Sequence, residues 1–443
     1  MPYGGIMAMR IFLCLLFLLI PFSKSFGSGE IEQRVKTLED FSKMQQKTIE
    51  QQQGVIDELK KGQKPEEDSG KQKTTAGSGL FGGSALSNPN ISLIVNSFFY
   101  SSNISGADLP NRGIPGFTTA GIGRQKGFNL DSAELFIFAP VDPYFNLYTN
   151  IPVTEDSAEV EEAYFITSSL PEGLQLKGGK FKSGFGRVNS QHPHAWDFAD
   201  LPIVYRAFIG GEGIAEKGIQ LTYLPILPFY TQLGVEALQG ENESLFGSDA
   251  KSGPHAYGVF AKTSFDFGDD STILFGPSVL TGKTKTDLVA RDTEFTGTST
   301  LYDIEFTYKW KPSKVRSFII QGEYMLRDQK GDLTNTSLST RNPFKRSQDG
   351  VYVQGIYQLN RWRIGARYEL LEIFKDQYLL SGTEQSFGRK PWRATGDIEF
   401  NLTEFSRIRF QYNYDRSAGD GRTNNEVFMQ LIFGIGAHAA HRF

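Results

Sequence analysis

The chain has 443 residues, 39% of them hydrophobic, and a formal net charge of -4. This length accommodates two or three soluble domains or one large barrel, and the near-balanced charge gives no electrostatic argument for nucleic-acid binding. The single cysteine, Cys14, lies in the predicted leader, so we expect no disulfide framework and no thiolate site in the mature protein.

Residues 1–27 have the features of a secretory signal peptide. Arg10 precedes an apolar run over residues 11–22, and the small residues Ser23 and Ser25 follow it. The run is shorter than the ~20 residues that a membrane-spanning helix requires, and a membrane anchor is the alternative interpretation. We therefore predict export across the inner membrane.

In residues 28–61 the side chains of one helical seam, from Ile31 to Leu59, recur at alternating spacings of three and four residues, which predicts a short α-helical coiled coil. Polar layers at Ser42, Gln45 and Gln52 weaken its seam, so association requires a tethered partner. A solvated helix that does not oligomerise is the alternative. Residues 62–87, rich in Gly, Ser, Lys and Pro, are predicted to form a flexible linker.

From residue 88 onward the sequence has a period of two. Between Trp392 and Leu402 apolar side chains take the even positions and mostly charged or polar ones the odd positions, and the pattern resumes from Ser406 to Tyr414. Strands with one apolar and one charged face suit a barrel that crosses the ~25 Å apolar band of a bilayer. A soluble barrel has the same pattern turned inside out, so alternation alone leaves the outer face undetermined.

Sixteen segments are predicted strands. They are residues 90–100, 128–140, 144–152, 159–169, 174–185, 218–224, 229–239, 257–267, 271–280, 299–310, 317–326, 350–359, 362–371, 392–402, 406–414 and 425–435. Short turns alternate with longer connections, as in a bacterial outer-membrane barrel with both chain ends in the periplasm. The predicted fold class is therefore all-β, a transmembrane antiparallel barrel of about 16 strands over residues 88–443, preceded by the coiled coil.

The longest connection, residues 187–217, is predicted to fold into the barrel. Trp196, Phe198, Tyr205 and Phe208 would form an unusually large apolar patch if the loop were exposed. Folding inward would narrow the channel.

Arginines from three neighbouring predicted strands form a basic wall opposite this loop. The expected pore constriction consists of Asp197, Asp200, Trp196, Arg363, Arg367, Arg393, Arg407 and Arg409. The aspartates facing the arginines would create a transverse field. Charge is also expected in any water-filled pore, so solvation without ion selectivity is the alternative to an anion preference.

Two histidines in the same loop suggest a metal site. His192, His194 and Asp197 offer nitrogen and oxygen ligands for zinc or a similar divalent ion, the one cofactor that the sequence suggests. The alternative is a folded loop whose histidines only form hydrogen bonds. His438 and His441 near the end allow the same two interpretations.

Enzyme motifs are missing from the sequence. There is no G-x-S-x-G, Walker loop or H-E-x-x-H, so we predict that the protein is not an enzyme. A hydrolase whose catalytic groups come from different strands is the alternative.

Two family resemblances follow from these features. The coiled coil ahead of a sixteen-stranded barrel resembles the phosphate-selective porin O and P family, which implies a homotrimer. Residues 141–144, 161–165, 191–198 and 438–443 are similar to outer-membrane proteins labelled zinc-regulated TonB-dependent receptors, which implies an outer-membrane location and a link to metal. A TonB-dependent transporter has a plug domain ahead of twenty-two strands, so TonB coupling is left open.

The sequence predicts a porin-like channel for passive diffusion of small hydrophilic solutes or ions in the outer membrane of a Gram-negative-type bacterium. The coiled coil would lie in the periplasm. Expected partners are outer-membrane lipid, two further copies of the chain, the barrel assembly machinery and peptidoglycan. The alternatives are a zinc-responsive or metal-specific uptake receptor and a structural barrel that tethers the envelope.

Overall fold

The structure is a computed structural model that describes residues 89–247, 253–290, 293–335 and 337–436. Outside these ranges lie the predicted signal peptide (1–27), coiled coil (28–61) and linker (62–87), and His438 and His441. No helix in the described part of the chain is long and apolar enough to cross a membrane.

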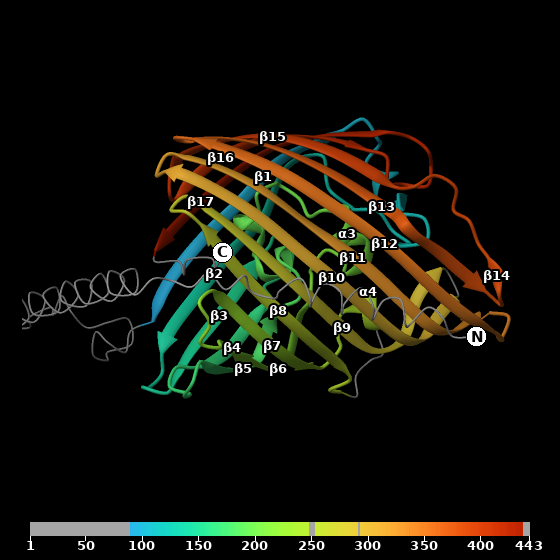
Figure 1. Ribbon diagram of the computed structural model, residues 1–443. Helices are drawn as coiled ribbons and strands as arrows, with labels where there is room; N and C mark the ends of the chain where they lie inside the picture. Colours follow the sequence, from blue (N-terminus) through green and yellow to red (C-terminus); the bar gives the residue numbers. More distant parts are fainter. Residues whose placement is uncertain (1–88, 248–252, 291–292, 336, 437–443) are drawn as a thin grey trace, which may run out of the picture. The chain divides into compact units, whose positions relative to one another are not determined.

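Sixteen strands form a closed antiparallel barrel (Figure 1). They are β1 Asn90–Ser102, β2 Gly127–Pro140, β3 Phe145–Val153, β4 Glu162–Thr167, β5 Leu174–Lys182, β6 Ala215–Tyr223, β7 Tyr230–Leu238, β8 Ala256–Phe267, β9 Ser271–Ala290, β10 Thr293–Ser313, β11 Arg316–Asn335, β12 Thr340–Leu359, β13 Trp362–Leu380, β15 Trp392–Thr403, β16 Ser406–Asp415 and β17 Asn424–Gly436. Each pairs with its neighbours in sequence, and β1 pairs with β17 to close the sheet. The predicted all-β barrel of 16 strands is confirmed.

Short elements decorate the connections. They are β14 Thr383–Glu384, which extends the hairpin after β13, the 3-10 turns η2 Leu109–Asn111, η3 Val188–Ser190 and η4 Pro193–Ala195, and the helices α3 Ile203–Phe208 and α4 Glu243–Phe246. Three of these five turns and helices, η3, η4 and α3, lie in the connection between β5 and β6.

The apolar side chains of the strands face outward and the charged ones face the lumen. On β15, Ile398 is 47% exposed and its neighbour Glu399 is 1% exposed, and on β16 Phe410 is 54% exposed and Arg409 is 1% exposed. A soluble barrel would show the opposite distribution. The structure therefore decides the question that the alternation left open, in favour of an outer surface that meets lipid.

Strand length differs between the two sides of the barrel. The strands from β9 to β13 have 19 to 21 residues, whereas those from β3 to β7 have 6 to 9. The predicted strands on the long side were too short at the end of the barrel with the longer connections: β11 continues to Asn335 instead of ending at residue 326, and β12 begins at Thr340 instead of residue 350. Beyond the apolar band a strand needs no apolar face, so residues such as Asp328 and Lys330 continue the ladder with polar side chains.

A hydrophobic core lies inside the barrel around α3. Ile203, Val204 and Phe208 are buried in one cluster with apolar side chains of the wall, among them Leu301 and Met325. Helix α3 packs against β12 and β13. These apolar side chains on the lumen face interrupt the alternation, and they hold the connection between β5 and β6 within the lumen.

Candidate functional site

The connection between β5 and β6, residues 183–214, is called the inner loop here because it lies inside the barrel (Figure 1). Its first turn is fixed by Glu323 of β11. The carboxylate accepts hydrogen bonds from the backbone N–H of Arg187 at 2.9 Å, from the Tyr205 hydroxyl at 2.6 Å and from the Tyr352 hydroxyl at 2.5 Å. One buried acid thus joins the start of the loop, its helix and the wall.

A buried ion-pair network fixes the middle of the inner loop to β13 and β15. Asp200 lies 2.7 Å from Arg367 and 2.8 Å from Arg393, and both arginines also contact Glu369 at 2.8 Å. Burial raises the pKa of Asp200, but the charges of Arg393 and Arg367 outweigh burial and hold that pKa well below its ordinary value. Asp200 is therefore ionised at neutral pH.

A second ion pair, between Asp197 and Arg363, is less buried than the pairs of Asp200. Asp197 contacts Arg363 at 2.5 Å, and Arg363 contacts Glu399 at 3.1 Å. Arg409 donates a hydrogen bond to the backbone oxygen of Trp196 at 2.8 Å and forms an ion pair with Glu399 at 2.6 Å. The aspartates and arginines that the sequence predicts at the constriction are therefore brought together, but as ion pairs in direct contact. The aspartates and arginines neutralise each other instead of facing across an open gap.

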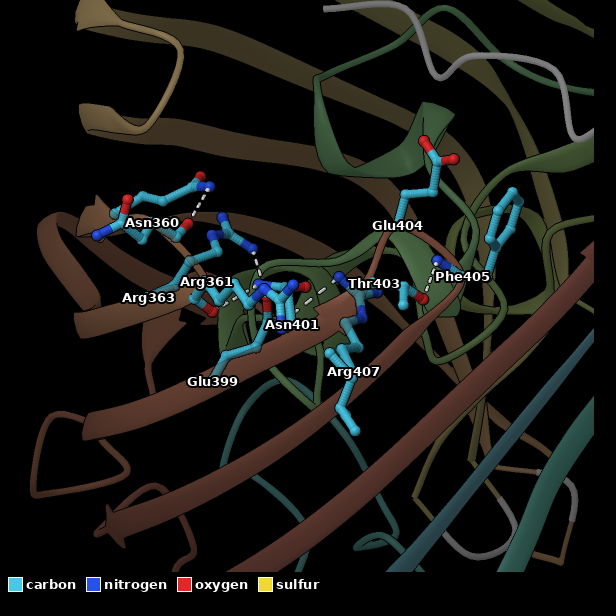
Figure 2. A pocket seen from close by; sticks show the side chains of 11 residues that line it. Asn360, Arg361, Arg363, Glu399, Asn401, Thr403, Glu404, Phe405 and Arg407 are labelled. Carbon is cyan, nitrogen blue, oxygen red and sulfur yellow. Dashed lines mark hydrogen bonds and ion pairs between the residues drawn. The ribbon is translucent and has the colours of Figure 1, made fainter.

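A cavity of about 830 Å³, called the inner cavity, lies beside these pairs. It is at the end of the barrel where short turns, such as residues 360–361 and 404–405, connect the strands; this end is called the short-turn end and the opposite one the long-loop end. Its lining residues come from the ends of β12 and β13 and from the hairpin of β15 and β16, including Arg361, Arg363, Arg407 and Glu399 (Figure 2). Arg407 stays 3.7 Å from Glu399, a longer contact than Arg363 makes. The lining thus carries three arginines and two carboxylates, Glu399 and Glu404.

An outer cavity, also of about 830 Å³, lies at the long-loop end of the inner loop. Trp196 and Asp200 are part of its lining. Its acidic residues are Asp131, Glu134, Glu159, Glu161, Asp200, Glu212, Glu216, Glu241 and Glu243, and its basic residues are Arg124, Lys180 and Arg206. Among the described residues none lines both cavities, and the two differ in the sign of their excess charge.

The histidines of the inner loop meet the opposite wall, formed by β2 to β4. Nδ1 of His192 lies 2.9 Å from Glu161 and its Nε2 lies 2.9 Å from Glu162, while Nδ1 of His194 lies 2.9 Å from Glu134. Burial lowers the pKa of His192, but the hydrogen bonds with Glu161 and Glu162 outweigh burial and raise that pKa to about 9.

The predicted metal ligands are therefore only partly brought together. His192 and His194 stack with their ring centres 5.7 Å apart, whereas Asp197 is bound to Arg363 on the other side of the lumen. Three carboxylates that no sequence spacing connects with the histidines take its place: Glu134, Glu161 and Glu162. The sequence shows these acids at or beside predicted strands. It does not show that they contact a loop some thirty residues or more away, because that contact depends on how the strands are arranged in the barrel.

The closed barrel, with its apolar outer surface, charged lumen and infolded loop, is the fold of a porin-like outer-membrane channel. The outer-membrane channel DcaP of Acinetobacter baumannii has the same fold, with a TM-score of 0.51 and 15% identity over 81% of this chain and 100% of that chain. OmpT of Vibrio cholerae, an outer-membrane protein, gives a TM-score of 0.50 and 12% identity over 80% of this chain and 99% of that chain.

The chain belongs to the same family as a protein of Aquifex aeolicus (strain VF5) that is described as uncharacterized. The two are 40% identical over 380 residues, which cover 80% of each chain. No family model matches the chain, so the resemblances to the phosphate-selective porins and to the zinc-regulated receptors stay predictions.

Proposed function

We propose that this protein is a passive, water-filled diffusion channel through which small hydrophilic solutes or ions cross the outer membrane. The observation that carries the proposal is the lumen itself: charged side chains line two cavities, one on each side of an infolded loop. Ionic lining keeps a pore hydrated and lets ions exchange their water for protein contacts.

The inner loop is proposed as the constriction, with separate tasks for its partners. Arg363 and Arg407 line the inner cavity and Trp196 lines the outer one, so these three meet the solute. Asp200 lies at the edge of the outer cavity, but its carboxylate is buried against Arg367 and Arg393 and anchors the loop. Arg367, Arg393 and Arg409 hold the loop against the wall through buried contacts. Asp197 joins the two groups through its pair with Arg363.

The test is single-channel recording with the purified protein in planar bilayers. We expect discrete ohmic steps, together with swelling of liposomes in solutions of small sugars. Protein that is folded and inserted but gives neither steps nor swelling would argue against a channel and for the structural alternative.

We further infer that the barrel is a homotrimer whose residues 28–61 associate in the periplasm. Strand length supports the trimer: the six residues of β4 reach about 20 Å, less than the ~25 Å apolar band even before tilt is considered. A neighbouring protomer that packs against the short strands would shield this side of the barrel from lipid where the strands do not span the apolar band. Deleting residues 30–61 should weaken the trimer on crosslinking while the barrel still inserts, and an unchanged oligomer would reject the role of that segment.

A further inference from the structure

Four side chains from neighbouring elements converge at one point of the lumen. Glu134 belongs to β2, Asn150 to β3, Glu161 directly precedes β4, and His192 lies in the inner loop. Glu134, Glu161 and His192 each offer one potential metal-ligand atom, and these three atoms lie within 4.8 Å of one another. The amide nitrogen of Asn150 contacts the same groups, at 3.4 Å, 2.8 Å and 3.0 Å respectively.

Every polar group of this cluster has a partner, but one contact is unfavourable in either protonation state of Nδ1 of His192. Nδ1 of His192 lies 2.9 Å from Glu161, which is favourable only when Nδ1 carries a proton and donates it. A protonated Nδ1 cannot accept from Asn150, so two donors then face each other at 3.0 Å. In the other tautomer Nδ1 accepts from Asn150, but no proton lies between it and the Glu161 carboxylate.

The spacing suits a bound cation. Ligands at about 2.1 Å from a tetrahedral zinc ion lie about 3.4 Å from one another. Measured from Nδ1 of His192, the oxygens of Glu161 and Glu134 lie at 2.9 Å and 3.8 Å, on either side of that value. Small side-chain rotations would equalise these distances.

Surrounding groups orient the ligand atoms. Nε2 of His192 donates to Glu162 at 2.9 Å, and Nδ1 is the nitrogen that points towards Glu161 and Glu134. Lys182 binds Oε1 of Glu161 at 2.6 Å, so Oε2 remains for the centre of the cluster. Carboxylates that bind the distal nitrogen of a histidine are the usual outer partners of metal sites. Glu134 and Glu161 also line the outer cavity, which gives an ion access from the long-loop end.

We propose that Glu134, Glu161 and His192 bind a divalent transition-metal cation of the Zn²⁺ type, with Asn150 turned so that its Oδ1 supplies the fourth ligand. The imidazole nitrogen favours such an ion over Mg²⁺ or Ca²⁺, which prefer oxygen ligands throughout. The ion would fasten the inner loop to the wall of β2 to β4. This site stands apart from conduction, because an ion can bind there whether or not the channel is open.

The test measures Zn²⁺ binding to the full-length protein, purified in detergent, stripped with a chelator and examined by equilibrium dialysis. We expect one tightly bound ion per chain. Glu162→Gln, which removes only an outer partner, should weaken binding by about 10- to 100-fold, and His192→Gln and Glu161→Gln, which remove a ligand, should each weaken it more than that. The matched controls are His255→Gln, outside the cluster, and the pair His438→Gln with His441→Gln, which should leave binding unchanged.

The variant Asn150→Asp separates a metal site from a hydrogen-bond network. A carboxylate supplies its oxygen without turning, so Zn²⁺ affinity should rise about 10-fold. Without an ion, a further carboxylate would add only repulsion. Absent or weaker Zn²⁺ binding by folded Asn150→Asp, or equal losses in the histidine controls, would overturn the proposal. If the same samples give ohmic steps without binding Zn²⁺, the metal site fails and the channel stands.

Discussion

At the scale of single residues, Asp200 helps to fix the position of the inner loop through its buried ion pairs with Arg367 and Arg393. Replacing Asp200 by Asn leaves Arg367 and Arg393 buried with only Glu369 as a carboxylate partner. Removing one member of a buried ion pair costs about 3–5 kcal/mol. We expect the inner loop of this variant to become sensitive to protease and the folded barrel to unfold at a lower temperature in detergent.

The matched control for Asp200 is Glu404→Gln. Glu404 is exposed in the turn between β15 and β16, so its amide variant should behave as the native protein does. Equal protease resistance of Asp200→Asn and the native chain would show that the buried pairs do not hold the loop.

The depressed pKa of Asp200 also gives a prediction for acid. A carboxyl group whose pKa is lowered by folding contributes stability above its ordinary pKa of about 3.9, and that contribution is lost as pH falls through the lowered value. The attachment through Asp200 should therefore persist from pH 7 to pH 4 and weaken only in stronger acid. Protease cleavage of the inner loop measured against pH checks this, and release of the loop already between pH 5 and pH 6 would contradict it.

At the scale of elements, the inner loop is expected to set the width of the channel. Its helix α3 fills the lumen against β12 and β13, so replacing residues 191–209 by a short Gly-Ser linker should raise single-channel conductance severalfold. Shortening residues 382–386, an exposed hairpin tip at the long-loop end, is the control and should change conductance little. If neither conductance nor ion selectivity responds to the first change, the inner loop is not the constriction.

At the scale of the whole molecule, the unequal wall predicts where protomers meet. Phe165 lies on β4 and is 38% exposed, whereas Ile364 lies on the long strand β13 and is 56% exposed. With Cys14 in the predicted leader, Phe165→Cys and Ile364→Cys each give the mature protein one thiol. A bifunctional maleimide should yield covalent dimers with Phe165→Cys only. Dimers from Ile364→Cys instead would place the interface on the long side.

The sequence by itself determined the number, order and closure of the strands. Alternation and turn length are local properties, and near Trp392 to Tyr414 they are so regular that the predicted and observed strands almost coincide. The sequence also determined that the aromatic residues of the connection after β5 are buried, because Tyr205 and Phe208 have too much apolar surface to be exposed to water. Both are fully buried.

Only the tertiary structure decided which face of the wall is outside and which charges meet. Alternation has the same form in a soluble barrel, and exposure of Ile398 beside burial of Glu399 is a property of the closed sheet. The partners of His192 come from strands far along the chain, so no sequence spacing connects them with it. Asp197 was expected beside that histidine because it is close in sequence, but the loop crosses the lumen between them, and long-range charge pairing placed it on Arg363.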